Sequence, residues 1–260
     1  MQKKFYFISD VHLGSGNNEI NKKTESLLIE FFEEIKSDAE ELFIAGDLFD
    51  FWIEYKRVVP RGYYNLFAKI SDLVKSGIKI TFLAGNHDFW RGNYFEEEFG
   101  IKRIDHPIER EIYGKKFFIA HGDGYSYKDT GYKIAKFIVR SRICQFLYSI
   151  LHPNFAIWLA KRTSARSRDY TTQKDFSERD GLRDFAKRKI EEGFDYVILG
   201  HRHFTEFKKT GNGIYINLGD WIKNFSYGVF DGSEFILNKY YDIQEKRILP
   251  AESRKIKKQD

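Results

Sequence analysis

Five short polar clusters in the sequence carry residues that could bind divalent metal ions. They contain five of the chain's seven histidines, together with aspartates and an asparagine. Imidazole nitrogens and carboxylate or amide oxygens suit borderline or hard cations such as Mn²⁺, Fe²⁺ and Zn²⁺. No thiol contributes, which argues against a structural zinc site of the cysteine type. The clusters are Asp10-Val11-His12, Gly46-Asp47-Leu48-Phe49-Asp50, Gly85-Asn86-His87-Asp88, His121-Gly122-Asp123 and Gly200-His201-Arg202-His203.

Together these residue types could hydrolyse a phosphoester at a pair of metal ions. A carboxylate at a strand end, such as Asp47, can bridge two ions about 3.5–4 Å apart. Such a pair clamps an in-line displacement at phosphorus and lowers the pKa of a bridging water. An imidazole beside the ions can protonate the leaving oxygen or stabilise developing charge. His87, next to the candidate ligand Asn86, is the candidate for that role.

Each cluster taken alone has an ordinary structural explanation. Asp-x-His is usually part of a turn, Gly-Asp-Leu-Phe-Asp could be an Asx turn, and Gly-His-x-His occurs more often in a loop than at a metal. The joint occurrence of the clusters, each at the end of an apolar run, favours the metal site. His106 and His152 precede prolines and lack such a context, so we interpret them as loop histidines.

The elements that must position these clusters are short strands. Helices predicted from the spacing of apolar residues alternate with the strands, which predicts an α/β fold with the ligands at the carboxyl edge of a sheet. The predicted strands cover 5–9, 41–45, 78–84, 117–120 and 196–199. The predicted helices cover 24–36, 63–76 and 179–191.

Three local features follow from these predicted elements. Thr24 is the expected N-cap of the first helix, after a flexible loop over 14–21. Asp10 and His12 are expected to point to the same side of an extended segment, because alternate side chains of a strand share a face. Further short strands at hairpin-like spacing suggest a second, partly antiparallel sheet. They cover 213–218, 227–230 and 235–240.

A basic and apolar stretch interrupts the alternation of strands and helices. From Tyr132 to Arg168 the only obvious break is at His152-Pro153-Asn154, so we predict two helices. Ten lysines or arginines but only two acidic residues lie between Lys128 and Lys174. The apolar residues are too many for one narrow stripe, which fits a helical cap with an exposed or lipid-facing surface. A buried helical hairpin with solvated lysines is the alternative.

These patterns divide the chain into three parts. Residues 1–124 and 176–250 form the predicted core, 125–175 a helical lid insertion, and 251–260 a basic, solvated tail. With 42% hydrophobic and 17% aromatic residues, the 260-residue chain can bury a core, which excludes global disorder.

Cysteine content and charge restrict the compartment and the partners. The single cysteine, Cys144, excludes an intramolecular disulfide and suits a reducing compartment. We expect neither secretion nor a membrane span, because we see no signal-peptide pattern and no apolar run of about 18 residues. A net charge of +5 suggests nucleic acid, a phosphorylated metabolite or an anionic membrane as partner, unless the basicity serves solubility alone.

In this order, the five clusters resemble the full signature of the calcineurin-like metallophosphoesterases, over approximately residues 5–220. The resemblance implies an α/β fold that forms a four-layer α/β/β/α sandwich around two divalent ions. It also assigns the ligands, with the carboxylate of Asp47 shared. One ion would be held by Asp10, His12, Asp47 and His203, and the other by Asp47, Asn86, His121 and His201.

Further segments are similar to one branch of that family, the UDP-2,3-diacylglucosamine hydrolases of lipid A biosynthesis. These segments are 46–53, 121–123, 129–132 and 161–168. In this branch the helical insertion forms a lid over the acyl chains. Water attacks the α-phosphorus with Mn²⁺ at the cytoplasmic face of the inner membrane, releasing UMP and 2,3-diacylglucosamine 1-phosphate. The resemblance implies substrate contacts from Asp129, Tyr132, Arg166 and Arg168.

One position departs from this branch. Many members best known for the activity have arginine where this chain has His87, which follows the general pattern of the wider family. The resemblance implies a lipid-linked nucleotide sugar as substrate, an anionic membrane surface as partner, and no stable nucleic-acid partner. Two alternatives stay open: a phosphodiesterase or phosphatase acting on another nucleotide or lipid phosphoester, and a metal-binding scaffold without activity. The complete ligand set with His87 speaks against the scaffold.

Overall fold

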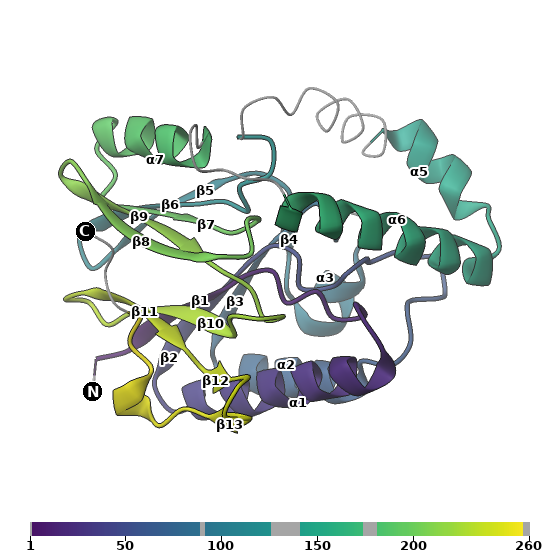
Figure 1. Ribbon diagram of the computed structural model, residues 1–260. Helices are drawn as coiled ribbons and strands as arrows, with labels where there is room; N and C mark the ends of the chain where they lie inside the picture. Colours follow the sequence, from purple (N-terminus) through teal and green to yellow (C-terminus); the bar gives the residue numbers. More distant parts are fainter. Residues whose placement is uncertain (1, 89–91, 126–140, 174–180, 257–260) are drawn as a thin grey trace.

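Two large sheets packed face to face form the centre of the molecule (Figure 1). The computed structural model describes residues 2–88, 92–125, 141–173 and 181–256. In spatial order the first sheet contains β11 (Phe235–Lys239), β10 (Ser226–Phe230), β1 (Lys4–Ile8), β2 (Ala39–Ala45), β3 (Lys79–Leu83) and β4 (Arg103–Ile104). The second contains β5 (Ile108–Ile112), β6 (Lys115–Ile119), β7 (Tyr196–Leu199), β9 (Gly213–Leu218) and β8 (Thr205–Thr210).

The strands that lead into the polar clusters run parallel within each sheet. β1 to β4 are parallel neighbours in the first sheet, and β6 and β7 are parallel neighbours in the second. Parallel strands deliver their carboxyl ends to the same edge of a sheet, so the clusters meet there. A separate ribbon pairs β12 (Tyr241–Asp242) with β13 (Arg247–Ile248).

Alternating side chains on the strands separate two apolar layers. On β1, Phe7 faces the second sheet and stacks on Phe43, with ring centroids 4.8 Å apart. Tyr6 and Ile8 point the other way, toward the helices on the outer face of the first sheet. These are α1 (Asn18–Ile35), α2 (Tyr64–Lys75) and α3 (Tyr94–Phe99).

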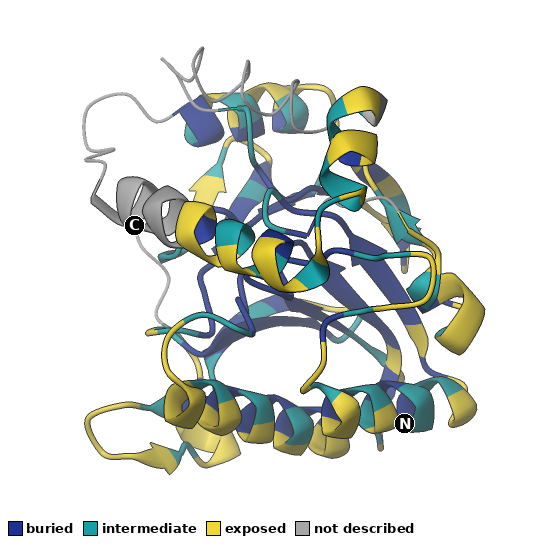
Figure 2. Ribbon diagram, turned by 90° about the vertical axis from the view of Figure 1, so that its right-hand side faces the viewer, coloured by how far each residue is buried: buried dark blue, intermediate teal, exposed yellow. Residues whose placement is uncertain are grey.

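The second sheet is covered in the same way by α7 (Gly181–Glu191), which buries Leu182, Ala186 and Ile190 against it. Figure 2 shows the consequence, with buried strands in the middle and exposed surfaces on the outer sides of the helices. The predicted four-layer α/β/β/α order is therefore confirmed.

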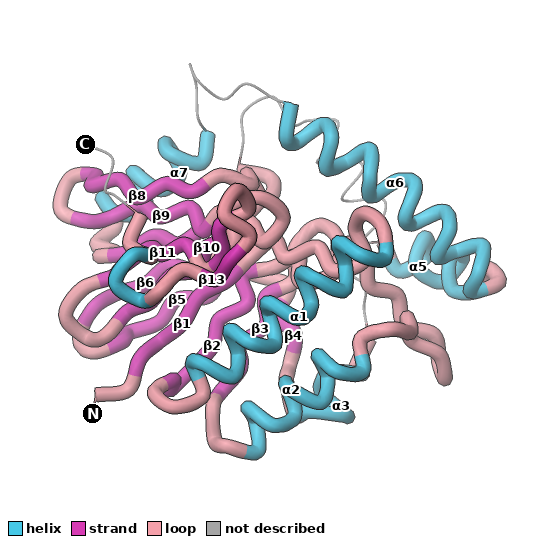
Figure 3. Tube along the Cα trace, turned by 60° about the horizontal axis from the view of Figure 1, so that its bottom comes forward, coloured by secondary structure: helices cyan, strands magenta, loops and turns pink. Residues whose placement is uncertain are grey.

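Two more helices lie to one side of the sheets, as Figure 3 shows. α5 (Arg142–Ser149) and α6 (Pro153–Gln173) meet at residues 150–152, so the predicted helix break at His152 is confirmed. We call this pair the α5–α6 hairpin. Its residues Tyr148, Ile157 and Ala160 pack on Phe51 and Ile53, which follow β2. Whether the hairpin acts as a lid stays a prediction.

The N-terminal end of α1 differs from the prediction. The helix begins at Asn18, six residues before the expected start at Thr24, and the side chain of Asn17 accepts a hydrogen bond from the Ile20 backbone N–H at 2.9 Å. Thr24 is buried inside the helix and is not its N-cap. An asparagine at the N-cap satisfies a backbone donor that has no partner within the helix.

The C-terminal strands are also distributed differently. β9 joins the second sheet, whereas β10 and β11 extend the first sheet from β1 by antiparallel pairing. The three strands therefore do not form a separate sheet. The partners of a strand depend on packing that its own sequence does not specify.

Residues 251–256 are held to the core through Arg254 and Ile256, although residues 251–253 and 255 are exposed, as expected for a solvated segment. A short 3₁₀ helix, Ala251–Ser253, leads into Arg254, which is only 6% exposed. Arg254 donates to the Leu249 carbonyl at 2.7 Å and forms an ion pair with Glu34 of α1. Ile256 adds a backbone hydrogen bond to Leu237 of β11. Residues 257–260 of the predicted tail lie outside the described residues.

Candidate metal centre

The candidate ligands lie in loops that follow five strands, at the edge shared by the two sheets. Asp10, Asp47 and Asn86 follow β1, β2 and β3 of the first sheet, and His121 and His201 follow β6 and β7 of the second. Backbone hydrogen bonds tie neighbouring loops together. The Asp10 N–H donates to the Gly46 carbonyl at 3.1 Å, for example. The two sheets thus each contribute part of one site.

The backbone at these residues is not extended. Asp10 and His12 have φ values of 53° and 51°, in the left-handed region, so they are not alternate residues of a strand as expected. Among the described residues, eight other than glycine have positive φ, and five of these are candidate ligands: Asp10, His12, Asp47, His201 and His203. Such conformations cost on the order of 1–3 kcal/mol each and concentrate at functional sites. Tight left-handed turns therefore aim these side chains inward.

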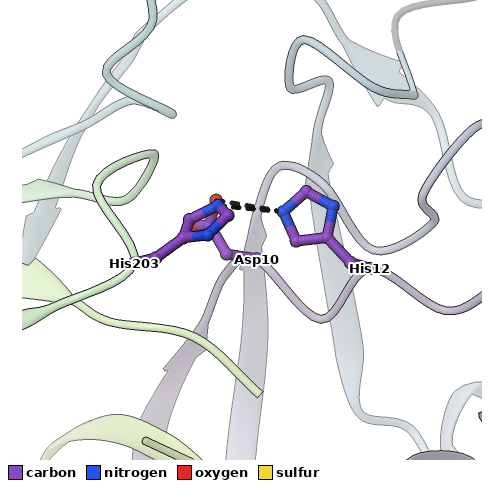
Figure 4. A group of neighbouring side chains, drawn as sticks. All are labelled: Asp10, His12 and His203. Carbon is purple, nitrogen blue, oxygen red and sulfur yellow. Dashed lines mark hydrogen bonds and ion pairs between the residues drawn. The ribbon is translucent and has the colours of Figure 1, made fainter. Parts of the chain in front are cut away.

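Three side chains converge at the end of β1 (Figure 4). The Nε2 atoms of His12 and His203 are 3.1 Å apart. Asp10 Oδ1 lies 3.3 Å from His203 Nε2 and 3.7 Å from His12 Nε2. One ligand atom from each of the three residues lies within 4.8 Å of the other two, as binding a single ion requires.

A second group forms around Asp47. Asp47 Oδ2 lies 3.3 Å from His121 Nε2 and 3.7 Å from His12 Nε2, so this oxygen stands between both groups. Asn86 Oδ1 lies 3.0 Å from His121 Nε2. His121 donates its Nδ1–H to the Ala45 carbonyl at 2.9 Å, an arrangement that orients Nε2 toward a metal in many metalloproteins. The ring of His201 lies beside that of His121, with centroids 5.2 Å apart.

In each of the buried carboxylates of Asp10 and Asp47, one oxygen accepts a backbone hydrogen bond and the other does not. Asp10 Oδ2 accepts the His201 backbone N–H at 2.9 Å, and Asp47 Oδ1 accepts the His87 backbone N–H at 2.8 Å. Their other oxygens, Asp10 Oδ1 and Asp47 Oδ2, are buried and have no hydrogen-bond partner within the described part of the chain. A buried anionic oxygen is costly unless a cation balances it. The donor set therefore fits a pair of divalent ions.

Glycines before the ligands allow this close packing. A Cβ on Gly85 would overlap the carboxylate of Asp47, and a Cβ on Gly200 would lie 2.5 Å from Asp10 Oδ2. Glycine is thus needed at both positions because backbone and carboxylate approach each other directly.

The carboxylates change the pKa of the neighbouring imidazoles. Burial by itself would lower the pKa of His12, but the carboxylates of Asp10 and Asp50, 3.7 and 3.6 Å from its ring nitrogens, outweigh burial and raise that pKa to about 9. At His121 burial is outweighed by the charges of Asp47 and Asp10, which raise the pKa to about 10. Burial opposes ionisation of Asp47, yet His121 and His87 hold its pKa far below the usual value. The cluster strongly favours bound positive charge.

The pKa values of two other histidines, His201 and His87, are lowered instead of raised. Burial lowers the pKa of His201 to about 4, and the positive charge of His121 adds to the effect. Burial also lowers the pKa of His87, although the charge of Asp47 opposes that shift. Both rings are therefore neutral at pH 7, the form in which imidazole binds metals.

His87 lies within the cluster. Its ring packs edge-on against His12, with centroids 4.7 Å apart, and one ring nitrogen lies within 4.8 Å of ligand atoms of His12 and Asp47. Its Nδ1 donates to the Asp50 carbonyl at 2.9 Å, since a carbonyl can only accept. In the neutral ring Nε2 then carries the lone pair.

Sequence reasoning did not assign a role to Asp88. Its buried carboxylate accepts backbone N–H groups of Gly85 at 2.7 Å and Leu48 at 2.8 Å, so it ties the loop after β3 to the loop after β2. Burial, with the nearby charge of Asp47, raises the pKa of Asp88 to about 6. The sequence feature that could have indicated this role is the position of Asp88 directly after His87 in the Gly-Asn-His-Asp cluster.

The structure does not describe the side chains of the predicted substrate-binding residues. Asp129 and Tyr132 are outside the described residues, and for Arg166 and Arg168 the structure gives only their place on α6. His106 and His152 lie in loops, as predicted.

The chain belongs to the calcineurin-like phosphoesterase family, whose model matches residues 3–204. It is similar to a protein of Porphyromonas gingivalis named UDP-2,3-diacylglucosamine hydrolase, at 33% identity over 94% of this chain and 100% of that protein. A Haemophilus influenzae protein of the same name is 31% identical over 86% of this chain and 93% of its own length.

Proposed function

We propose that this chain hydrolyses the pyrophosphate of UDP-2,3-diacylglucosamine to UMP and 2,3-diacylglucosamine 1-phosphate in a metal-dependent reaction of lipid A biosynthesis. The observation that carries the proposal is the similarity to the P. gingivalis hydrolase, which extends over the whole of that protein. The buried cluster of carboxylates and imidazoles supports a metal-dependent phosphoester hydrolase, the chemistry of the family.

In this proposal two divalent ions, for which we propose Mn²⁺, bind at the cluster. When bound, they supply Lewis acidity toward phosphoryl oxygens and lower the pKa of the attacking water. The side chains of the chain fix the ions' positions, and Asp47 serves both. One ion is assigned to Asp10, His12, Asp47 and His203, and the other to Asp47, Asn86, His121 and His201.

We assign proton handling to His87. With Nδ1–H fixed on the Asp50 carbonyl, Nε2 is the atom that gains and releases a proton. Because the lowered pKa leaves the ring mainly neutral at pH 7, the proton is delivered to the leaving oxygen by the minor imidazolium form, which is a stronger acid than free imidazolium.

The α5–α6 hairpin is proposed to bind the acyl chains and to face an anionic membrane at the cytoplasmic side of the inner membrane. Of eleven exposed large hydrophobic side chains among the described residues, six lie on this hairpin. They are Ile143, Phe146, Leu147, Ile150, Phe155 and Trp158. Such concentration marks an interaction surface, and Lys161 and Arg162 beside it complement anionic head groups. No helix in the described ranges combines the length and apolarity needed to cross a bilayer.

Charged substitutions on this surface are expected to weaken membrane binding. The double variant Phe146→Asp, Trp158→Asp should sediment with phosphatidylglycerol-containing vesicles at least roughly tenfold less than the unchanged protein, since an exposed large apolar side chain gains about 1.5–3 kcal/mol on full burial. Tyr64→Asp, at a still more exposed position on α2, is the control and should bind unchanged. If the double variant sediments as well as the unchanged protein, the hairpin does not contact the membrane.

The activity itself can be measured directly. Incubation with Mn²⁺ and UDP-2,3-diacylglucosamine should release UMP, and chelation of the metal should stop the release. A short-chain analogue should be a poor substrate at all salt concentrations, because acyl recognition is apolar and is not screened by salt. Hydrolysis of a generic phosphodiester without release of UMP would instead identify a phosphodiesterase with another substrate, an outcome that His87 in place of arginine makes worth testing.

A further inference from the structure

Ser164 and Ala156 are the two buried residues in the part of α6 whose side chains are described, 153–164, and Ser164 is the polar one. It is 7% exposed, whereas the three residues before it, 161–163, are all exposed. Ala156 and Ala160 precede it at intervals of four, so the three small residues lie on one face of α6. This is the face on which Ala160 packs against Phe51 and Ile53. Ser164 therefore continues the contact face of the helix toward the metal centre.

The hydroxyl of Ser164 contacts two groups of that centre. Ser164 Oγ lies 2.7 Å from the Asp50 carbonyl oxygen and 2.7 Å from His87 Nδ1. Because a carbonyl only accepts, the hydroxyl donates its proton to Asp50. Its oxygen then accepts from His87 Nδ1–H, which is also directed at the Asp50 carbonyl at 2.9 Å. The contacts among Ser164, His87 and the Asp50 carbonyl are thus all satisfied when the proton of the His87 ring is on Nδ1.

This contact joins three segments of the chain. Asp50 follows β2, His87 follows β3, and Ser164 belongs to α6, 77 residues after His87. The side chain of Asp50 also faces the centre, with Oδ1 3.6 Å from His12 Nδ1. Further along α6 are Arg166 and Arg168, the predicted substrate contacts. The hydroxyl of Ser164 is therefore the point at which the α5–α6 hairpin meets His87.

We propose that Ser164 is a positioning residue that couples the seating of α6 to the orientation of His87. The inference rests on the proposed metal-dependent hydrolysis. It adds to that proposal that His87 is correctly oriented for proton transfer only when Ser164 of α6 is hydrogen-bonded to the Asp50 carbonyl. The serine acts through His87 and touches no reacting atom.

The test compares Ser164→Val with Ser164→Thr. The two variants have nearly the same shape: both add one methyl group to serine, and valine carries a second methyl group where threonine keeps the hydroxyl. Loss of a hydrogen-bonding partner of a metal-site residue costs about 10–100-fold in activity, so kcat of the valine variant should be at least about tenfold below that of the threonine variant. KM should change less than about twofold, because ground-state binding is retained. Thr163→Ala removes a neighbouring exposed hydroxyl whose hydrogen bonds within the described residues go to the Leu159 and Ala160 carbonyls, and should have no effect.

Two readouts distinguish positioning from a structural role. In a His87→Ala background the valine and threonine variants should have equal kcat, because coupled residues are not additive. In the full-length chain with ¹⁵N-labelled histidine, the ring nitrogens of His87 should report a protonated Nδ1 in the threonine variant. The valine variant should show a shifted Nδ1 signal, with and without Mg²⁺, because Nδ1–H loses the hydroxyl oxygen and keeps the Asp50 carbonyl.

Equal kcat values for the valine and threonine variants would overturn the proposal. So would a difference that persists without His87, or unchanged His87 ring signals. Should UDP-2,3-diacylglucosamine not be hydrolysed, the kcat comparison is made with a phosphodiester that has an alkoxide leaving group, because departure of an alkoxide requires a proton. The ¹⁵N signals of the His87 ring test the inference without any substrate. The inference can therefore fail or hold whether or not the proposed function is correct.

Discussion

Asp47→Asn is expected to reduce hydrolysis to background while the protein stays folded. Asparagine has nearly the same size and keeps an oxygen for the His87 backbone N–H, now 2.8 Å from Asp47 Oδ1. It removes the charge of the oxygen that lies near both His121 and His12. Loss of one preorganised electrostatic group typically costs 10²–10³ in rate, so loss of a carboxylate shared by two ions should exceed about 10³.

Metal content separates this explanation from unfolding. Elemental analysis should find the variant depleted of metal, and its circular dichroism spectrum should match that of the unchanged protein. Asp72→Asn, a substitution of the same chemistry on the exposed side of α2, should leave activity and metal content unchanged. Wild-type metal content and turnover in Asp47→Asn would contradict the bridging role.

His87→Ala is expected to keep the metals and to lose rate by a factor on the order of 10² to 10⁴, the usual contribution of a general acid. The loss should be larger for a phosphodiester whose leaving group is an alkoxide than for bis(p-nitrophenyl) phosphate, because p-nitrophenolate leaves without a proton. Rates on both substrates, measured at full metal loading, test this directly.

Two further outcomes assign the role of His87. Loss of metal in His87→Ala would make this residue a ligand, as its place in the group with His12 and Asp47 allows. His87→Arg restores a cation but not a proton donor, because the arginine pKa exceeds 12. Recovery of rate in His87→Arg would therefore show that charge stabilisation is the main contribution.

The elements that carry the site could be predicted from the sequence, because buried parallel strands are short apolar runs that end at polar clusters. The strands before Asp10, Asp47 and His201 are of this kind. β8, Thr205–Thr210, escaped prediction since it contains two lysines and two threonines and pairs only with β9. The first turns of α1 escaped for a similar reason, because residues 18–23 are mostly exposed and polar and lack an apolar period.

The site was predictable in its composition but not in its geometry. Histidine and aspartate at five strand ends indicated a metal centre, whereas the left-handed backbone of Asp10 and His12 depends on loop packing between neighbouring strands. Ser164 lies in segment 161–168, which carries the resemblance, but its contact with His87 could not be predicted, because that contact depends on how α6 docks 77 residues further along the chain. Tertiary contacts of this kind have no local pattern to read.

The distribution of the ligands along the chain also bears on when metal can be acquired. The first candidate ligand is residue 10 and the last is residue 203, and each sheet supplies only part of the set. A ribosome-bound chain that ends before β7 lacks two imidazoles and the strand that carries them into place. If the ions bind as proposed, the complete site can be loaded only after most of the polypeptide has been made, and bound ions would then fasten the two sheets to each other at their common edge.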